Sequence, residues 1–285
     1  MRATGIAGLL GSLVSDLRGR FPDRVPIIGV SGAQGAGKSY QCRKFVAANP
    51  RVAYFSLDDV YLTKAERVWR ADNISSFNAV RDEDGNFQVT HVPRPDVERL
   101  LLTRGPPGTH DLALAKAVIE RLREPSLSKL PRFDKAADDR APESGWPVFQ
   151  GPAEAILVDG WCLGATPPPP SEPLNDVERE DIDRIWRRET EAQLRKSYQP
   201  FFATFNAILY LKPPSWEAVQ LWRAEQEAEN LGRTLTPDDR ARLDRFMQHY
   251  ERITRSMMAG GHCANWVIEQ DERRNAIGFR EVRSG

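Results

Sequence analysis

The 285-residue chain has few cysteines, no long hydrophobic run and no excess of charge of either sign. Its three cysteines are far apart and lack C-x-x-C spacing, which excludes a disulfide framework and favours a reducing compartment. No run reaches the roughly eighteen apolar residues that a membrane span requires. We therefore expect a cytoplasmic protein without a membrane partner.

The charge balance narrows the possible partners. Forty basic and forty acidic residues give a formal net charge of zero. A protein that binds nucleic acid mainly through its phosphates needs a positive surface, so the balance argues against a nucleic-acid partner. A small-molecule substrate is the better expectation, and the sequence does not distinguish a monomer from a homodimer. The sequence also lacks the guanine-reading N-K-x-D segment of regulatory GTPases.

The most informative segment is the run Gly-Ala-Gln-Gly-Ala-Gly-Lys-Ser at 32–39, which matches the phosphate-binding pattern G-x-x-x-x-G-K-[ST]. An apolar run at 24–30 predicts a buried strand before it, and a helix is predicted after it, at 38–47. Glycines let successive backbone N–H groups surround a β-phosphate, and the helix N-terminus adds partial positive charge. ATP and Mg²⁺ are therefore the expected cofactors, since Lys38 can reach the phosphates and Ser39 can bind the ion. The predicted ATP-binding residues are Gly32, Ala33, Gln34, Gly35, Ala36, Gly37, Lys38, Ser39 and Tyr40.

Short apolar runs alternate with helical stretches along the rest of the chain. Five strands are predicted, at 24–30, 52–57, 155–158, 207–211 and 266–268. This alternation is typical of a parallel sheet covered on both faces, so we predict an α/β P-loop NTPase fold with a mainly parallel five-stranded sheet. Ligands bind at the carboxyl ends of such strands, where Gly32, Asp58 and Asp159 fall.

We expect a single domain, 1–285, with three special regions. Apolar residues at helical spacing in 1–20 predict an amphipathic docking helix rather than an export signal. Nearly a hundred residues separate the second and third strands. That is too long for a plain crossover, so 60–150 is expected to form a substrate-region insertion. A polar stretch at 231–239 interrupts two charged helices, which predicts a hinged lid over about 213–240.

Each part needed for phosphoryl transfer from ATP to an alcohol has a candidate residue. Asp58 leaves the strand beside the phosphate loop and is the predicted general base. Asp159 ends an apolar strand as a Walker B carboxylate does, so Ser39 and Asp159 are the predicted metal ligands; a strand-end turn is the alternative. Lys38 and Arg223 are predicted to offset the charge of the γ-phosphate. Alternatively, Arg223 belongs to a solvated helix face.

Other charged residues are candidates for the acceptor side of the site. Arg132, Lys135 and Arg140 surround one aromatic residue and can bind a carboxylate, with a solvated surface loop as the alternative. His110 follows a Gly-Pro-Pro-Gly turn at the start of a predicted helix, where it either contacts an anionic or hydroxylated substrate or takes part in a cap. Asp59 either has a direct role in the chemistry or is a turn or helix-cap residue.

Together these motifs resemble the D-glycerate 3-kinase family, P-loop enzymes related to uridine kinase, pantothenate kinase and phosphoribulokinase. Besides the phosphate loop, the resemblance rests on Asp-Asp-x-Tyr-Leu-Thr at 58–63, Arg-Gly-x-x-Gly-Thr-His-Asp at 104–111 and Pro-Arg-Phe-Asp-Lys at 131–135. It covers most of the chain. Asp159 stands where relatives often show Glu, and 164–175 is an unusually proline-rich insertion. The resemblance implies substrate contacts from Asp59, Tyr61, Arg104, His110, Arg132 and Lys135.

The implied activity is ATP-dependent phosphorylation of the primary hydroxyl of D-glycerate, which yields 3-phosphoglycerate and ADP. A kinase of the same fold that acts on pantothenate or a nucleoside is an alternative. The cationic side chains at 132, 135 and 140 favour a small carboxylate over a neutral nucleoside. A nucleotide-dependent switch protein is the alternative from a different class.

Overall fold

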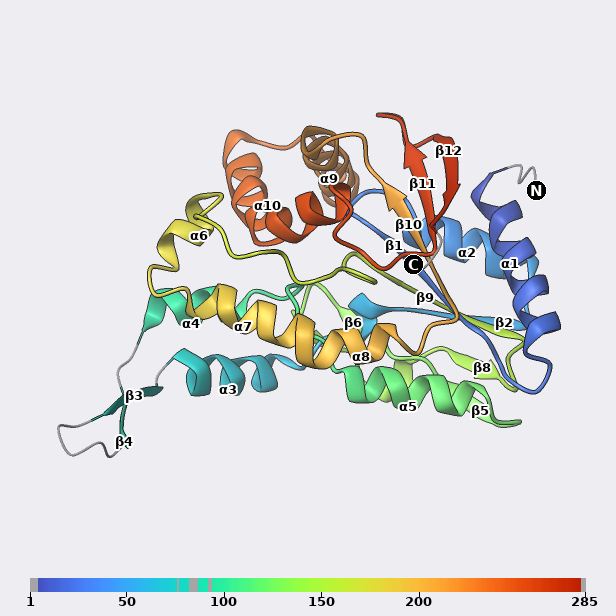
Figure 1. Cartoon of the computed structure of the whole chain (residues 1–285), viewed down its shortest axis with the longest axis horizontal. Coiled ribbons are helices and arrows are strands. Elements are labelled where there is room, and N and C mark those ends of the chain that lie inside the picture. The colour runs from blue at the N-terminus through green and yellow to red at the C-terminus, as the bar shows by residue number, and fades with distance from the viewer. Residues whose placement is uncertain (1–4, 76, 82–86, 92–93, 283–285) are drawn as a thin grey trace.

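The structure is a computed structural model that describes residues 5–75, 77–81, 87–91 and 94–282. A six-stranded sheet lies at its centre, in the order β12-β11-β10-β1-β9-β2, with helices on both faces (Figure 1). All neighbours in this sheet pair in parallel except β11 and β12. The strands are β1 (Ile27–Gly32), β2 (Val52–Ser56), β9 (Ala155–Gly160), β10 (Ala207–Lys212), β11 (Trp266–Gln270) and β12 (Ala276–Glu281).

The five predicted strands are present and parallel, which confirms the mainly parallel sheet, and β12 adds a sixth strand that the sequence did not predict. β12 pairs antiparallel with β11 at the edge of the sheet. Its Ile277 and Phe279 are 67% and 38% exposed. The strand was missed because an edge strand needs no continuous apolar run, unlike the central strands, which are buried on both faces.

Alternating side chains of β1 point into two different cores. Ile28 and Val30 pack with the buried faces of α1 (Ile6–Arg20) and α2 (Lys38–Ala48). Ile27 packs on the opposite face of the sheet, with α5 (Leu112–Leu122) and α8 (Gln199–Phe202). This period of two is the geometry of a strand, and it requires apolar residues at every position when both faces are covered.

Three connections at the carboxyl ends of the strands carry the remaining elements. The first, from β2 to β9, contains η1 (Leu57–Val60), α3 (Lys64–Ser75), β3 (Phe77–Arg81), β4 (Phe87–His91), α4 (Pro95–Leu102), α5, β5 (Leu127–Lys129), β6 (Phe133–Asp134), β7 (Asp139–Arg140), η2 (Glu143–Gly145) and β8 (Val148–Gln150). The second, from β9 to β10, contains α6 (Asp176–Glu180), α7 (Ile185–Gln193), the π-helical turn η3 (Leu194–Tyr198) and α8. The third contains α9 (Trp216–Leu231) and α10 (Pro237–Met258). Gly232 ends α9 with φ 64°, and Thr236 caps α10, so 232–236 is the break between the two helices.

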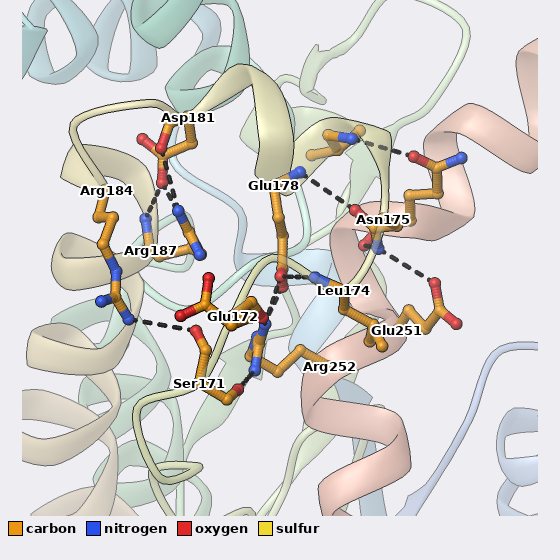
Figure 2. A network of polar contacts seen from close by, with 12 residues as sticks. Ser171, Glu172, Leu174, Asn175, Glu178, Asp181, Arg184, Arg187, Glu251 and Arg252 are labelled. Atoms are coloured by element: carbon orange, nitrogen blue, oxygen red, sulfur yellow. Dashed lines mark hydrogen bonds and ion pairs between the residues drawn. The ribbon is translucent and has the colours of Figure 1, made fainter.

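The contact between α6 and α10 is polar (Figure 2). Glu178 of α6 is 1% exposed and accepts a 2.7 Å hydrogen bond from Nε of Arg252 on α10. Arg252 also donates to the carbonyl oxygen of Glu172, at 2.7 Å. Asn175 caps α6 and donates to Glu251 of α10, at 3.0 Å. A buried carboxylate without a cation would be costly, so this ion pair determines how α6 docks on α10.

Replacing Arg252→Met should lower the free energy of unfolding by about 3 kcal/mol, because it leaves the Glu178 carboxylate buried without its charge partner. Urea denaturation measures the change. The control is Arg179→Met on α6, the helix that carries Glu178, because the ion pair of Arg179 with Asp176 leaves the side chains 61% and 70% exposed. That exposed pair should contribute less than about 1 kcal/mol. If both variants lose the same free energy of unfolding, the buried ion pair between Glu178 and Arg252 does not have this stabilising role.

Candidate active site

The carboxyl ends of β1, β2 and β9 surround a cavity of about 690 Å³. The phosphate loop follows β1, Asp58 lies in η1 directly after β2, and Asp159 is the penultimate residue of β9. All three strand ends contribute to the lining. A cavity of this size is in the ordinary range for a small-molecule site, and polar side chains converge in it.

The phosphate loop lies close against α9. Residues 34–40 line the cavity, whereas Gly32 and Ala33 form the entry of the loop behind them. Gly35 has φ +76°, and a Cβ atom there would lie 2.6 Å from the Cβ of Trp222 on α9. Only glycine fits both the left-handed backbone and this approach. The loop is therefore shaped by its glycines and held against a helix of the predicted lid.

Lys38, the first residue of α2, is turned back onto its own loop. Its Nζ donates to the carbonyl oxygen of Ala33, at 2.8 Å. Burial lowers the pKa of Lys38, while the nearby Asp159 and Asp58 carboxylates act in the opposite direction. An anionic phosphate is the natural counter-charge for an ammonium group held in this way.

Ser39 and Asp159, the two predicted metal ligands, contact each other. The Ser39 hydroxyl donates to Oδ2 of Asp159 at 2.5 Å, and Tyr54 donates to Oδ1 at 3.2 Å. Burial raises the pKa of Asp159, which Lys38 and Ser39 counteract. A hydroxyl and a carboxylate beside a phosphate loop are oxygen ligands that suit Mg²⁺. The described residues contain no cluster of three or more His, Cys, Asp or Glu side chains for a metal, so these two fit an ion that keeps nucleotide and water ligands.

Asp58 faces the cavity from η1 with its carboxylate already engaged. It accepts hydrogen bonds from the Tyr61 hydroxyl, at 2.9 Å, and from Nζ of Lys135, at 3.0 Å. Burial raises its pKa, but Lys135, His110 and the two hydrogen bonds outweigh burial and bring it to about 2. The carboxylate is therefore ionised at neutral pH and can accept a hydrogen bond from a substrate hydroxyl.

Arg104, Tyr61 and Lys135 line the same part of the cavity as Asp58. The guanidinium group of Arg104 pairs with Asp138. Lys135 is more mobile in principle, since 61% of its side chain is exposed. Two cations beside an ionised carboxylate make a subsite that suits a small acid with a hydroxyl group.

His110, Asp59 and Arg132 do not line the cavity. His110 is 5% exposed, bonds through Nδ1 to the Tyr198 hydroxyl at 2.6 Å, and stacks on Tyr61. Burial lowers its pKa to about 4, so it is neutral at pH 7. Asp59 accepts from Arg132, at 3.3 Å, and so ties the 130–135 segment to η1. These contacts support the neighbouring Tyr61 and Asp58, and direct contact of the three with substrate stays a prediction.

Arg223 reaches the cavity from α9. One Nη atom pairs with Glu227 at 2.8 Å. The other, Nη1, is buried and has no hydrogen-bond partner within the part of the chain that the structure describes. Its role toward the γ-phosphate stays a prediction.

The loop between β11 and β12, for which no role was predicted, also lines the cavity through Arg273 and Arg274. Nε of Arg274 donates to the carbonyl oxygen of Gly35 at 2.7 Å, and its guanidinium group lies 5.3 Å from the ring centroid of Trp222. In the sequence, two arginines of a polar loop that line a cavity cannot be distinguished from two arginines that are exposed to solvent. The available signal was their place directly after a strand.

Comparisons with known proteins show which proteins the chain is similar to. No family model matches the chain. D-glycerate 3-kinase of Arabidopsis thaliana chloroplasts is 27% identical over 287 residues, a match that covers 90% of this chain but 55% of that protein. An uncharacterised kinase of Schizosaccharomyces pombe is also 27% identical, with 86% of this chain and 88% of that protein covered. A probable ATP-dependent kinase of Saccharomyces cerevisiae is 24% identical, over 86% and 84% of the two chains.

Solved structures show the same fold. D-glycerate 3-kinase from Cryptococcus neoformans superposes with a TM-score of 0.70 at 21% identity, over 97% of each chain. A putative fructose transport system kinase from Silicibacter superposes with a TM-score of 0.55 at 15% identity, over 90% of this chain and 98% of that one.

The chain has the fold of P-loop kinases, with a mostly parallel sheet, and its kinase-named relatives support the class of ATP-binding transferases. Within that class, the relatives confirm the resemblance to the D-glycerate 3-kinase family that the motifs indicated. None of the described helices is long and apolar enough to span a membrane.

Lys38→Met should weaken ATP binding about tenfold to hundredfold, because a charge-assisted contact to the phosphates is lost. The same variant should keep or raise the thermal unfolding temperature, since burial already disfavours the charged form of Lys38. Calorimetric titration and thermal unfolding measure the two effects. Lys44→Met, an exposed lysine of the same helix, is the control and should change neither. If Lys38→Met binds ATP as tightly as the wild-type protein, Lys38 does not contact the phosphates.

Proposed function

We propose that this chain transfers the γ-phosphoryl group of ATP to the primary hydroxyl of D-glycerate, giving 3-phosphoglycerate and ADP. The observation that carries the proposal is the convergence of the phosphate loop, an ionised Asp58 and the cations Arg104 and Lys135 on one cavity. Similarity to proteins named D-glycerate 3-kinase supports this acceptor over pantothenate or a nucleoside.

The phosphate loop and Lys38 hold the β- and γ-phosphates of ATP, with the loop amides and the N-terminus of α2 directed at the anion. Ser39 and Asp159 would hold Mg²⁺, which neutralises phosphate charge when it is bound. Arg223 approaches from α9 and offsets the charge that spreads over the transferred group. Closure of α9 and the 232–236 break over the nucleotide would exclude water from the reaction.

Arg104 and Lys135 bind the carboxylate of the acid, so that its far hydroxyl points to Asp58 and the γ-phosphate. Lys135 also donates to Asp58, so the carboxylate of the acid and Asp58 share this lysine. Asp58, with a pKa of about 2, is a weak base. In a loose transition state the hydroxyl proton is released late, so Asp58 acts first by orienting the hydroxyl and then by accepting its proton.

ADP release from Mg²⁺-ATP should rise at least tenfold with D-glycerate and stay at the acceptor-free level with L-glycerate, pantothenate or uridine. Coupled steady-state assays measure ADP, and mass spectrometry identifies 3-phosphoglycerate as the product. If pantothenate or uridine stimulates ADP release instead, the chain is a kinase of the same fold that acts on that acceptor. A flat panel with ATP still bound would refute the proposed reaction and favour a switch protein.

Asp58→Asn should lower kcat about a hundredfold to ten-thousandfold, because the amide cannot accept the hydroxyl proton. The KM for ATP should change less than threefold, since the phosphate loop is intact. Asp59→Asn is the matched comparison, because its carboxylate pairs with Arg132 outside the cavity lining. It should affect kcat at least tenfold less. Near-normal turnover by Asp58→Asn would show that Asp58 is not the base.

A further inference from the structure

The main chain at Arg104 is fixed from two sides. The Tyr250 hydroxyl of α10 donates to the carbonyl oxygen of Arg104 at 2.8 Å, and Nε1 of Trp161 donates to that of Gly105 at 2.9 Å. A Cβ atom at Gly105 would lie 2.0 Å from the Tyr250 oxygen, so the loop and α10 are in close contact. These bonds hold the backbone but leave the long side chain of Arg104 free to rotate. Its position in the cavity needs a further constraint.

Asp138 supplies that constraint, together with a second arginine. Its Oδ1 accepts from Nη1 of Arg104. Its Oδ2 accepts from Nη2 of Arg67 on α3 at 2.7 Å, and the same Arg67 nitrogen donates to the Asp138 carbonyl oxygen at 2.7 Å. Arg67 is 2% exposed and therefore cannot move away. One carboxylate thus links a buried, fixed guanidinium group to one that faces the cavity.

The turn of the β6–β7 hairpin presents Asp138 in a left-handed conformation, with φ 53°. Asp and Asn adopt this region more readily than other residues with a side chain. Asp134 closes the turn by accepting from the backbone N–H groups of Ala136, at 2.9 Å, and Ala137, at 3.1 Å. Asp134 therefore stabilises the turn, whereas Asp138 supplies the carboxylate that binds Arg67 and Arg104.

The ring of Phe133 completes the support. The guanidinium carbons of Arg67 and Arg104 lie 5.6 Å and 5.8 Å from its centroid, in the range of cation–π contacts. Tyr61, which lines the cavity, packs edge-on against the same ring at 5.1 Å. Two guanidinium groups share one carboxylate, so the cluster keeps one net positive charge beside the cavity.

We propose that Asp138 is a positioning residue that fixes the Arg104 guanidinium in the cavity wall, where it is preorganised for the carboxylate of the acceptor. The link to the acceptor's carboxylate rests on the proposed function, whereas the link between Asp138 and Arg104 does not. Preorganisation matters because a freely rotating arginine must be ordered anew each time the acid binds.

Asp138→Asn is the informative variant, since Asn keeps the shape and tolerates the left-handed backbone but removes the charge. The KM for D-glycerate should rise about tenfold to hundredfold, while the KM for ATP stays within twofold and kcat within threefold. Asp134→Asn is the matched control in the same hairpin, and it should leave the KM for D-glycerate within twofold. An equal rise in both variants would overturn the proposal, because it would trace the effect to the turn rather than to Arg104.

A double-mutant cycle separates positioning from a purely structural role. Asp138→Asn should lower the thermal unfolding temperature in the wild-type and Arg104→Ala backgrounds alike, because buried Arg67 loses its carboxylate in both. Its effect on the KM for D-glycerate should fall below twofold once Arg104 is absent. An undiminished effect in the Arg104→Ala background would show that Asp138 does not act through Arg104.

Crystal structures of the wild-type protein and Asp138→Asn distinguish this inference from the proposed function. We expect the guanidinium group of Arg104 to leave the cavity wall in the variant. If it does so but the wild-type protein does not respond to D-glycerate, the proposed function fails and the positioning role stands. If D-glycerate is phosphorylated but Arg104 and the KM are unchanged in the variant, the positioning role fails and the proposed function stands.

Discussion

The parallel register of β9 between β1 and β2 is the constraint on which the site depends. Asp159 lies opposite Val30 on one neighbour and Ser56 on the other. The phosphate loop therefore begins two residues beyond one partner, and Asp58 lies two residues beyond the other. Because a shift of one residue would turn Asp159 to the opposite face, the same pairing that buries the core also brings the phosphate loop and the carboxylates of Asp159 and Asp58 to one cavity.

The two halves of the cavity are stabilised by different forces. The nucleotide half is built on central strands whose apolar side chains pack on both faces of the sheet. The acceptor half is built on loops and on the β6–β7 hairpin, whose strands have two residues each. Polar contacts hold these segments: Asp138 accepts from Arg104, and Asp59 accepts from Arg132. Such contacts are directional, which allows precise placement of charges without a large buried area.

The nucleotide half could be predicted from the sequence, because each of its strands is a short continuous apolar run and the glycine pattern is local. The acceptor half could be predicted only as a set of candidates. Lys135 meets Asp58 across 77 positions and Arg104 meets Asp138 across 34, and no spacing rule encodes such pairs. His110 has the residue type and motif of a substrate ligand, yet the fold buries it behind Tyr61. Edge strand β12 and the arginine loop before it lacked a distinctive pattern.

The cavity concentrates positive charge although the chain as a whole has no net charge. Three carboxylates line it, those of Asp58, Asp159 and Glu229, against seven cations, those of Lys38, Arg43, Arg104, Lys135, Arg223, Arg273 and Arg274. The local excess of positive charge is therefore concentrated where low-dielectric walls focus the field, while the rest of the surface carries the compensating negative charge. Lys38 and Arg223 reach the cavity from α2 and α9, whereas Arg104 and Lys135 reach it from the connection between β2 and β9. Among these cations Lys135 acts directly on Asp58: burial raises the pKa of this carboxyl, but Lys135, His110 and the hydrogen bonds from Lys135 and Tyr61 bring it to about 2, so the carboxylate stays ionised in the cavity.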